Sequence, residues 1–112
     1  MGQSNSWSTL EHVNSWNRTA LSLCRERRYE EAIALFDQVI QVEPGNSLAW
    51  YGRGDALANL KRYRDALSNF NTAIELDPFN HEAWTFRGVV LLYLERFQEA
   101  LESCDRALSL KS

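Results

Sequence analysis

With 112 residues, of which 45% are hydrophobic and 24% charged, the chain has the length and balance of one ordinary globular domain. The formal net charge of −3 argues against nucleic acid as a partner, because proteins that bind nucleic acid usually carry a basic face. No apolar run approaches the roughly 18 to 20 residues that a membrane-spanning helix needs, so we expect no membrane partner either.

Residues 1–12 form a polar lead-in, which we expect to be partly disordered or to extend the first helix. They lack the basic start and apolar core of a secretion signal. Gly2 and Ser6 match the short pattern for N-terminal acylation, and this modification remains an alternative. Cys24 and Cys104 form no CxxC motif, and without a secretion signal they indicate reduced thiols in a cytoplasmic protein.

Apolar residues recur at steps of three and four along the chain, which is the spacing of amphipathic helices and not of strands. Ser8 and Glu11 have the spacing of a capping box, which predicts an early start of the first helix. Trp7 and Leu10 would then shield this end of the domain. The predicted helices, in chain order, are 9–26, 29–42, 47–60, 63–76, 81–94 and 97–110.

The sequence repeats itself with a period of 34 residues. The stretch VEPGNSLAWYGRG at 42–54 returns as LDPFNHEAWTFRG at 76–88. This register predicts one three-repeat domain over residues 13–112, and each unit reads as helix, tight turn, helix. The breaks between helices fall at the triplets RRY, KRY and ERF, where basic residues balanced by neighbouring acids predict a solvated, salt-paired edge. The three units are 13–46, 47–80 and 81–112.

Small residues recur where the two helices of a unit must pack closely. Ala20, Gly54 and Gly88 share one position of the first helices. A glycine inside a helix costs about 1 kcal/mol relative to alanine, so its recurrence predicts a crossing of two backbones that leaves no room for a side chain. The second helices carry an alanine at their matching position, in Ala32, Ala66 and Ala100. The aromatic residues expected to fill the space beside these contacts are Trp16, Trp50, Trp84, Tyr29, Tyr63 and Phe97.

This set of residues resembles the tetratricopeptide repeat family, whose pattern is met here by Trp50, Gly54, Ala66, Phe70 and Pro78. The resemblance covers about 100 of the 112 residues. It implies an all-α fold, a right-handed superhelical α-solenoid of three tetratricopeptide-type helix-turn-helix units. The repeats are also similar in style to repeats common in bacterial proteins.

No set of residues converges as a catalytic or metal site requires, so we predict no enzyme, no cofactor and no metal. His12 and His81 are the only histidines, and we expect both to face solvent at helix starts in different units. Cys104 occupies a core position, and Cys24 has no nearby histidine to activate it. Residues 52–55 include GRG and RGD, but their expected place inside a helix argues against a dinucleotide loop and an adhesion motif.

In the tetratricopeptide repeat family, the first helix of each unit lines the concave side, so the resemblance implies a groove that binds a protein or peptide. Leu21, Tyr51, Val89 and Tyr93 are not needed for the packing stripe, and they predict a peptide-contact strip. The asparagines could bond an extended peptide backbone. The groove residues implied by the resemblance are Asn14, Asn17, Leu21, Cys24, Arg25, Leu48, Tyr51, Asp55, Asn59, Glu82, Thr85, Val89, Leu92 and Tyr93.

Some members of this family bind the acidic C-terminal tails of heat-shock chaperones through five lysine, asparagine and arginine residues. The matching positions here hold Asn17, Leu21, Gly52, Glu82 and Phe86. None of the expected cations is present and Glu82 would repel a carboxylate, so we expect this class of ligand not to bind.

No further helix follows the third unit, so Leu101, Cys104, Leu108 or Leu110 is expected to leave apolar area uncovered. Either the chain is cut from a longer array or copies of it meet through their ends. Our main functional hypothesis is therefore an adaptor or scaffold that binds a protein or peptide in the groove. The alternative is a structural self-assembly unit, a homo-oligomer through its terminal repeats, which predicts concentration-dependent self-association.

Overall fold

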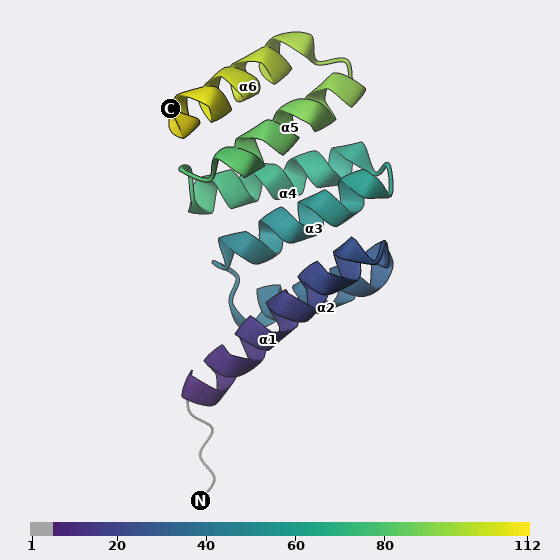
Figure 1. Cartoon of the computed structure of the whole chain (residues 1–112), viewed down its shortest axis with the longest axis vertical. Helices are drawn as coiled ribbons and strands as arrows, with labels where there is room; N and C mark the ends of the chain where they lie inside the picture. The colour runs from purple at the N-terminus through teal and green to yellow at the C-terminus, as the bar shows by residue number, and fades with distance from the viewer. Residues whose placement is uncertain (1–5) are drawn as a thin grey trace, which may run out of the picture.

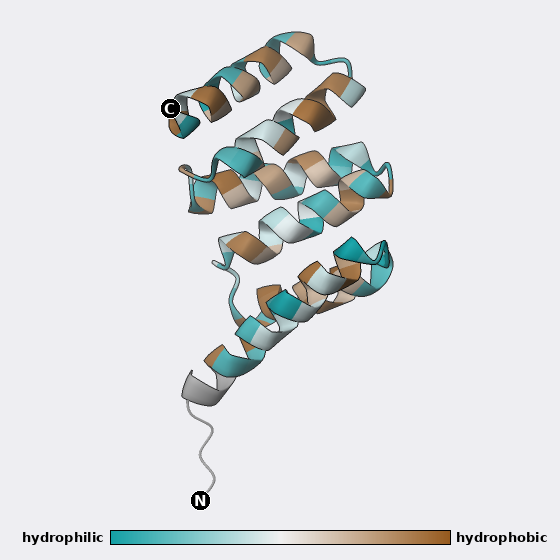
Figure 2. Cartoon of the chain, in the orientation of Figure 1, coloured by the Kyte–Doolittle hydropathy of each residue, from teal (hydrophilic) through white to brown (hydrophobic). Residues whose placement is uncertain are grey.

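The computed structural model describes residues 6–112, and the side chains of residues 10–112. Within this range every regular element is a helix, and the helices stack in chain order along the longest of its 57 × 28 × 20 Å dimensions (Figure 1). Hydrophobic and hydrophilic segments alternate along the helices, as expected when each buries one face (Figure 2). The helices are α1 (Ser6–Arg25), α2 (Tyr29–Val42), α3 (Ser47–Asn59), α4 (Tyr63–Leu76), α5 (His81–Tyr93) and α6 (Phe97–Lys111).

Five of the six predicted helices match the observed bounds to within one residue at each end. The first helix differs because α1 begins at Ser6, so Ser8 lies inside it and the predicted capping box is wrong. Leu10 is 53% exposed and shields little of this end. The acylation pattern at Gly2 and the side chain of Trp7 lie outside the described residues.

The connections between units are held by the same two interactions. Asn46 caps α3, where its side-chain oxygen accepts a hydrogen bond from the Ala49 amide at 2.9 Å, and Asn80 caps α5 in the same way. The indole of Trp50 donates to the carbonyl of Pro44 at 2.8 Å, and that of Trp84 to Pro78 at 2.9 Å. The recurring Pro, Asn and Trp therefore fix how one unit follows another.

The turn inside each unit closes in the same way, although none contains glycine. Arg27, Lys61 and Glu95 adopt φ values of 64°, 65° and 61°. In the second unit the amide of the following residue, Arg62, donates to the carbonyl of Leu57 at 2.9 Å, and the other two turns form the equivalent bond. The residue in the left-handed conformation and the hydrogen bond from the residue after it end the first helix and reverse the chain.

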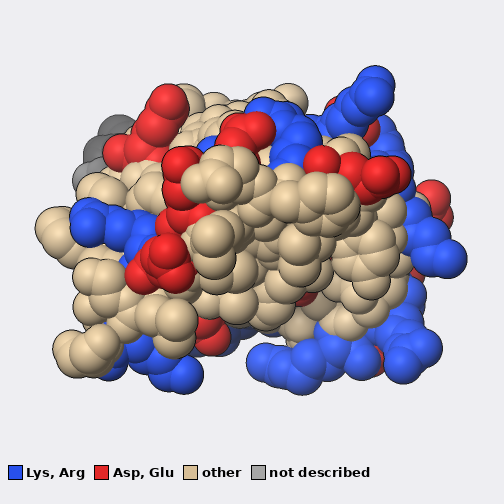
Figure 3. All heavy atoms as spheres, turned by 90° about the horizontal axis from the view of Figure 1, so that it is seen from above, with Lys and Arg blue, Asp and Glu red and all other residues tan. Residues whose placement is uncertain are grey.

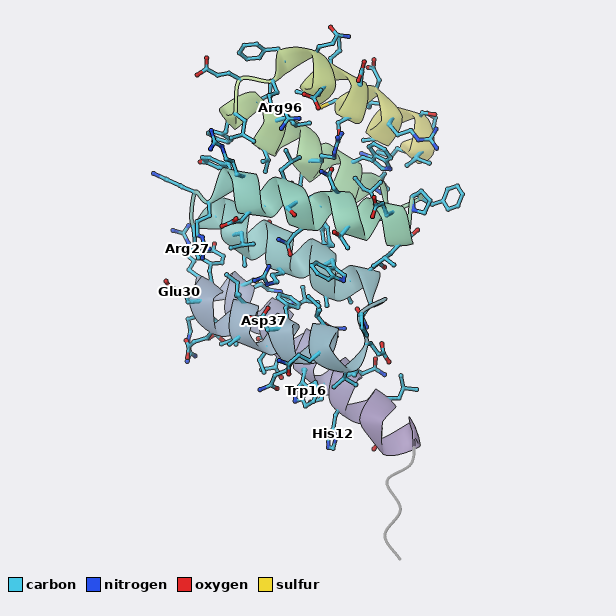
Figure 4. The ribbon with its side chains drawn as sticks, turned by 180° about the vertical axis from the view of Figure 1, so that it is seen from behind. His12, Trp16, Arg27, Glu30, Asp37 and Arg96 are labelled. Atoms are coloured by element: carbon cyan, nitrogen blue, oxygen red, sulfur yellow. The ribbon has the colours of Figure 1, made fainter. Side chains whose placement is uncertain are left out.

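The predicted salt-paired edge lies at these turns. Arg62 pairs with Asp65 at 2.9 Å, and the corresponding arginines of the other units pair with Glu31 and Glu99 at 2.6 and 2.7 Å. Figure 4 shows Arg27 and Arg96 at two of these turns. All of these pairs are exposed, so they contribute little to stability.

Within a unit, the prediction that the glycines leave no room for a side chain is confirmed, but the prediction that a second backbone fills the space is wrong at Gly54. A Cβ atom added to Gly54 would lie 2.9 Å from the Phe70 ring, and one added to Gly88 would lie 2.6 Å from the Cys104 sulfur. The neighbours that exclude a side chain are thus mainly side chains of the second helices. Phe97 departs from the prediction that it fills the space beside these contacts, since it is 62% exposed.

Between units, each second helix packs against the following first helix through a buried core and a polar contact. The Arg53 side chain donates to the Asp37 carboxylate at 2.7 Å, and Arg87 donates to Asn71 at the same distance one unit later. Figure 4 shows Asp37 on α2. A second bond from Arg53 to Asn69, at 3.0 Å, joins α3 to α4. This arginine therefore links one unit to the next.

Candidate binding groove

The first helices of the three units make up the inner side of the solenoid. Contacts occur between α1 and α3 and between α3 and α5, whereas no comparable contacts join α2, α4 and α6. The stack therefore curves toward the side of the first helices. We call the surface formed by α1, α3 and α5 the groove face.

A hollow of about 360 Å³ opens on this face between α3 and α5. Four residues predicted from the resemblance meet there: Asp55, Asn59, Val89 and Tyr93. Val89 is 40% exposed and Tyr93 63% exposed, so both offer apolar surface to a ligand. The remaining lining residues are Ala58, Lys61, Tyr63, Phe86 and Val90. We call this cavity the α3–α5 hollow.

Several predicted groove residues lie elsewhere on the surface. Glu82 and Thr85 border a second hollow of about 480 Å³, which also contacts α6 through Cys104 and Leu108. The other exposed members of the predicted set, outside both hollows, are Asn14, Arg25, Leu48 and Leu92.

Three predicted groove residues are part of the packing. Asn17 is only 5% exposed, and its side-chain amide points to the Asn46 oxygen at 3.5 Å, so it is not available to a peptide backbone. Leu21 and Cys24 are half-buried against the core shared by α1, α2 and α3. The prediction that Leu21 has no structural role is therefore wrong.

Tyr51 also has a structural role that the repeat pattern did not reveal. Its ring lies 6.1 Å from that of Phe70 and 6.0 Å from that of Phe86, and it packs against the core between units two and three. The prediction that Tyr51 is free apolar surface is wrong. Asn59 is likewise engaged, since its amide donates to the Asp55 carbonyl at 2.8 Å.

Two aromatic residues of the α3–α5 hollow were not predicted as groove residues. Phe86 is 36% exposed and occupies the position that Gly52 holds one unit earlier. Tyr63 stacks on Tyr93, with ring centroids 4.5 Å apart and planes 3° from parallel. The aligned repeats already showed Phe86 at the position of Gly52. This difference could have predicted that Phe86 lines the groove face.

The groove face is negatively charged around Tyr51. Burial raises the pKa of the Asp55 carboxyl, and a hydrogen bond from Asn59 opposes this only in part. Burial is also the main cause that raises the pKa of the Tyr51 hydroxyl, and the charges of Glu82 and Asp55 add to it. Among residues 10–112, no lysine or arginine forms an ion pair with Asp55.

The Cys24 thiol is not arranged as a nucleophile. Burial raises its pKa to about 11, the Asp55 charge adds to the rise, and Arg25 opposes it. His12 lies inside α1, where it stacks on Trp16 at 5.9 Å (Figure 4), so its predicted place at a helix start is wrong. His81 begins α5 and is half-buried.

Within the part of the chain that the structure describes, no three His, Cys, Asp or Glu side chains gather as metal ligands would. None of the described helices combines the length and the apolar character needed to cross a membrane. The groove face thus provides aromatic, aliphatic and carboxylate groups that are suited to contact another molecule.

Comparison with known proteins connects this architecture to a family. A family model described as Tetratricopeptide repeat matches residues 23–90, more than half of the chain, and a second model of the same description matches residues 81–112. No curated protein sequence matches the chain.

Solved structures with the same fold include proteins in complex with peptides. The second TPR of Spaghetti (RPAP3) bound to the HSP90 peptide SRMEEVD is 25% identical, with a TM-score of 0.86 over 88% of this chain and 92% of that one. The TPR2B domain of yeast Sti1, in a complex with an Hsp70 partner, is 21% identical, with a TM-score of 0.86 over 89% and 80%. MamA from Desulfovibrio magneticus RS-1 is 19% identical, with a TM-score of 0.83 over 89% and 56%.

Proposed function

Because the chain belongs to the tetratricopeptide repeat family, we propose that it is a non-enzymatic adaptor or scaffold that binds a protein or peptide on its groove face. The observation that carries the proposal is the α3–α5 hollow, where Val89 and Tyr93 offer apolar surface beside half-buried aromatic rings. The proposal places the protein in the cytoplasm, where Cys24 and Cys104, both unpaired, would remain reduced, and in a bacterial source.

The peptide complexes of the similar structures support a peptide as the ligand of this face. Their acidic ligand is not proposed for this chain, because the five positions that would hold an acidic tail carry no cation here. Asn17 is buried, Gly52 is covered by the Phe36 ring and Glu82 is negatively charged. The proposed ligand is therefore a peptide of different charge.

Affinity purification from the source organism tests this function. The Val89→Ser, Tyr93→Ala double variant removes apolar surface from the groove face and is expected to lose the partners that wild type recovers. The matched control, Phe79→Ala with Val42→Ala, removes exposed apolar side chains that lie outside both hollows. Recovery of the same partners by both double variants would refute the groove as the binding surface.

A second candidate function, self-assembly through the C-terminal repeat, is supported by the surface of α6. Leu101 and Leu108 are 56% and 65% exposed. In the view from the C-terminal end, uncharged side chains cover the middle of the surface and charged ones lie mainly toward its edges (Figure 3). Exposed leucines within an uncharged area of this kind are typical of an interface with another protein chain.

A further inference from the structure

We propose that the α3–α5 hollow receives a lysine or arginine side chain of the bound peptide, with Asp55 supplying the negative charge that selects it. This inference rests on the proposed binding function of the groove face and adds the chemistry of the ligand. An arginine or lysine flanked by an apolar residue is the ligand class that fits.

The shape of the hollow accommodates a long side chain with an aliphatic stem. Val89 and Phe86 supply aliphatic and aromatic walls from α5. The stacked pair of Tyr63 and Tyr93 supplies a flat aromatic surface beside them. Arginine and lysine bury their methylene stems against such walls and place the charged group over an aromatic ring or against a carboxylate.

The charge of the hollow favours a cation. Asp55 lines it from α3, and among residues 10–112 its one side-chain partner is the Asn59 amide at 3.4 Å, a long hydrogen bond. Glu82 lies outside this hollow, at the border of the second one, and adds negative charge to the same groove face. A carboxylate that is withdrawn from water and has no paired cation is stabilised when a cation binds beside it.

The positive charges of this region do not neutralise Asp55. Lys61 lines the hollow but is an exposed turn residue, and it makes no ion pair with Asp55. Arg25 lies at the end of α1, outside the lining of the hollow, and its charge acts on Cys24. Within the hollow, Asp55 is therefore a carboxylate without an ion-paired cation, and Lys61 is the one cationic residue of the lining.

The experiment is selection of a random peptide library displayed on phage against wild type and two variants. Asp55→Asn removes the charge with little change of shape, and Glu75→Gln removes an exposed carboxylate from α4 as a matched control. Wild type and Glu75→Gln are expected to select peptides with Lys or Arg at one fixed position, and Asp55→Asn is expected to lose this enrichment.

One selected peptide is then measured by fluorescence anisotropy, together with a version in which citrulline or norleucine replaces the basic residue. We expect each neutral peptide to bind wild type about ten-fold more weakly or worse, and little difference between the two versions on Asp55→Asn. This change is made on the peptide, so its result does not depend on the folding of a variant. The acidic HSP90 peptide SRMEEVD is the probe of opposite charge and is expected not to bind.

Three outcomes would overturn the inference: selected peptides without excess Lys or Arg, equal enrichment with Asp55→Asn, or equal affinity of the neutral peptides. The groove function itself fails if the selected peptides bind the Val89→Ser, Tyr93→Ala variant as tightly as wild type. It also fails if no peptide is selected at all. Loss of binding in that double variant, combined with no basic preference, would leave the groove function standing and refute only the cation.

Discussion

Charged residues at the three turns hold a backbone conformation that glycine adopts more easily. Arg27, Lys61 and Glu95 all have φ near 60°, where a side chain costs roughly 1 kcal/mol or more. All three side chains are exposed to solvent. The turns therefore retain conformational strain that side-chain packing does not explain.

Lys61→Gly is expected to raise the free energy of unfolding by up to about 1 kcal/mol, because glycine removes the steric cost of the left-handed conformation. Urea denaturation followed by circular dichroism measures the change. Arg62→Gly is the control, since Arg62 has a φ of −93° and pairs with Asp65, and it is expected to lower stability. Equal or opposite effects of the two variants would contradict the strain at Lys61.

Cys24 provides a test of the electrostatics of the groove face. Its pKa of about 11 keeps it as a thiol at pH 8, and the thiolate is the reactive form. In a Cys104→Ala background, we expect iodoacetamide to label Cys24 at least about ten-fold more slowly than free cysteine at pH 8, with a rate that rises up to about pH 11.

Asp55→Asn should speed this labelling. The Asp55 charge raises the pKa of the thiol, so its removal lowers that pKa and increases the thiolate fraction at pH 8. Glu75→Gln should leave the rate unchanged. An Asp55→Asn rate equal to that of the parent would show that the Asp55 charge does not contribute to the raised pKa of the thiol.

At the scale of the helices, packing between units depends on where the small residues lie. Gly52 faces the Phe36 ring of the preceding unit, while Gly54 faces Phe70 of its own unit. α3 can therefore approach helices on both sides. In α5 the position of Gly52 is occupied by Phe86, whose ring packs near Phe70 at 6.4 Å instead.

Gly52→Ala is expected to lower the free energy of unfolding by about 1 to 3 kcal/mol, since its Cβ would overlap the Phe36 ring and force it to move. The gain in helix propensity of about 1 kcal/mol offsets only part of this cost. Gly45→Ala is the matched control, because nothing lies within 4 Å of its added Cβ, and it should leave stability nearly unchanged. A Gly52→Ala protein as stable as wild type would contradict the close packing of α2 and α3.

At the scale of the whole molecule, the two ends of the solenoid differ in polarity. Ala49 in α3 and Ala83 in α5 are buried against the preceding unit, and the matching position of α1 holds Ser15. Likewise Arg18 stands in α1 at the position of Gly52. The outer side of α1 is therefore polar, whereas α6 exposes Leu101 and Leu108 among charged residues, so the two ends do not complement each other.

Self-association, if it occurs through the ends, should therefore join two C-terminal repeats and stop at a dimer. Leu101→Glu with Leu108→Glu is expected to abolish the concentration-dependent dimer in sedimentation velocity, because it places charges in the apolar area. Arg18→Glu at the opposite end is the control and should leave the dimer intact. Oligomers larger than a dimer, or loss of association in the control, would contradict this geometry.

The sequence by itself determined the helices and their order. Helix spacing, the prolines and the 34-residue period are local or repeated signals, so the bounds followed with only α1 beginning earlier than predicted. Asp55, Val89 and Tyr93 were placed on the groove side by the resemblance to the tetratricopeptide repeat family together with the repeat register. Only the tertiary structure decided which groove residues remain free, because that depends on side chains of neighbouring units. Asn17 became buried beside Asn46, Tyr51 became half-buried against Phe70 and Phe86, and Phe86 became a wall of the hollow.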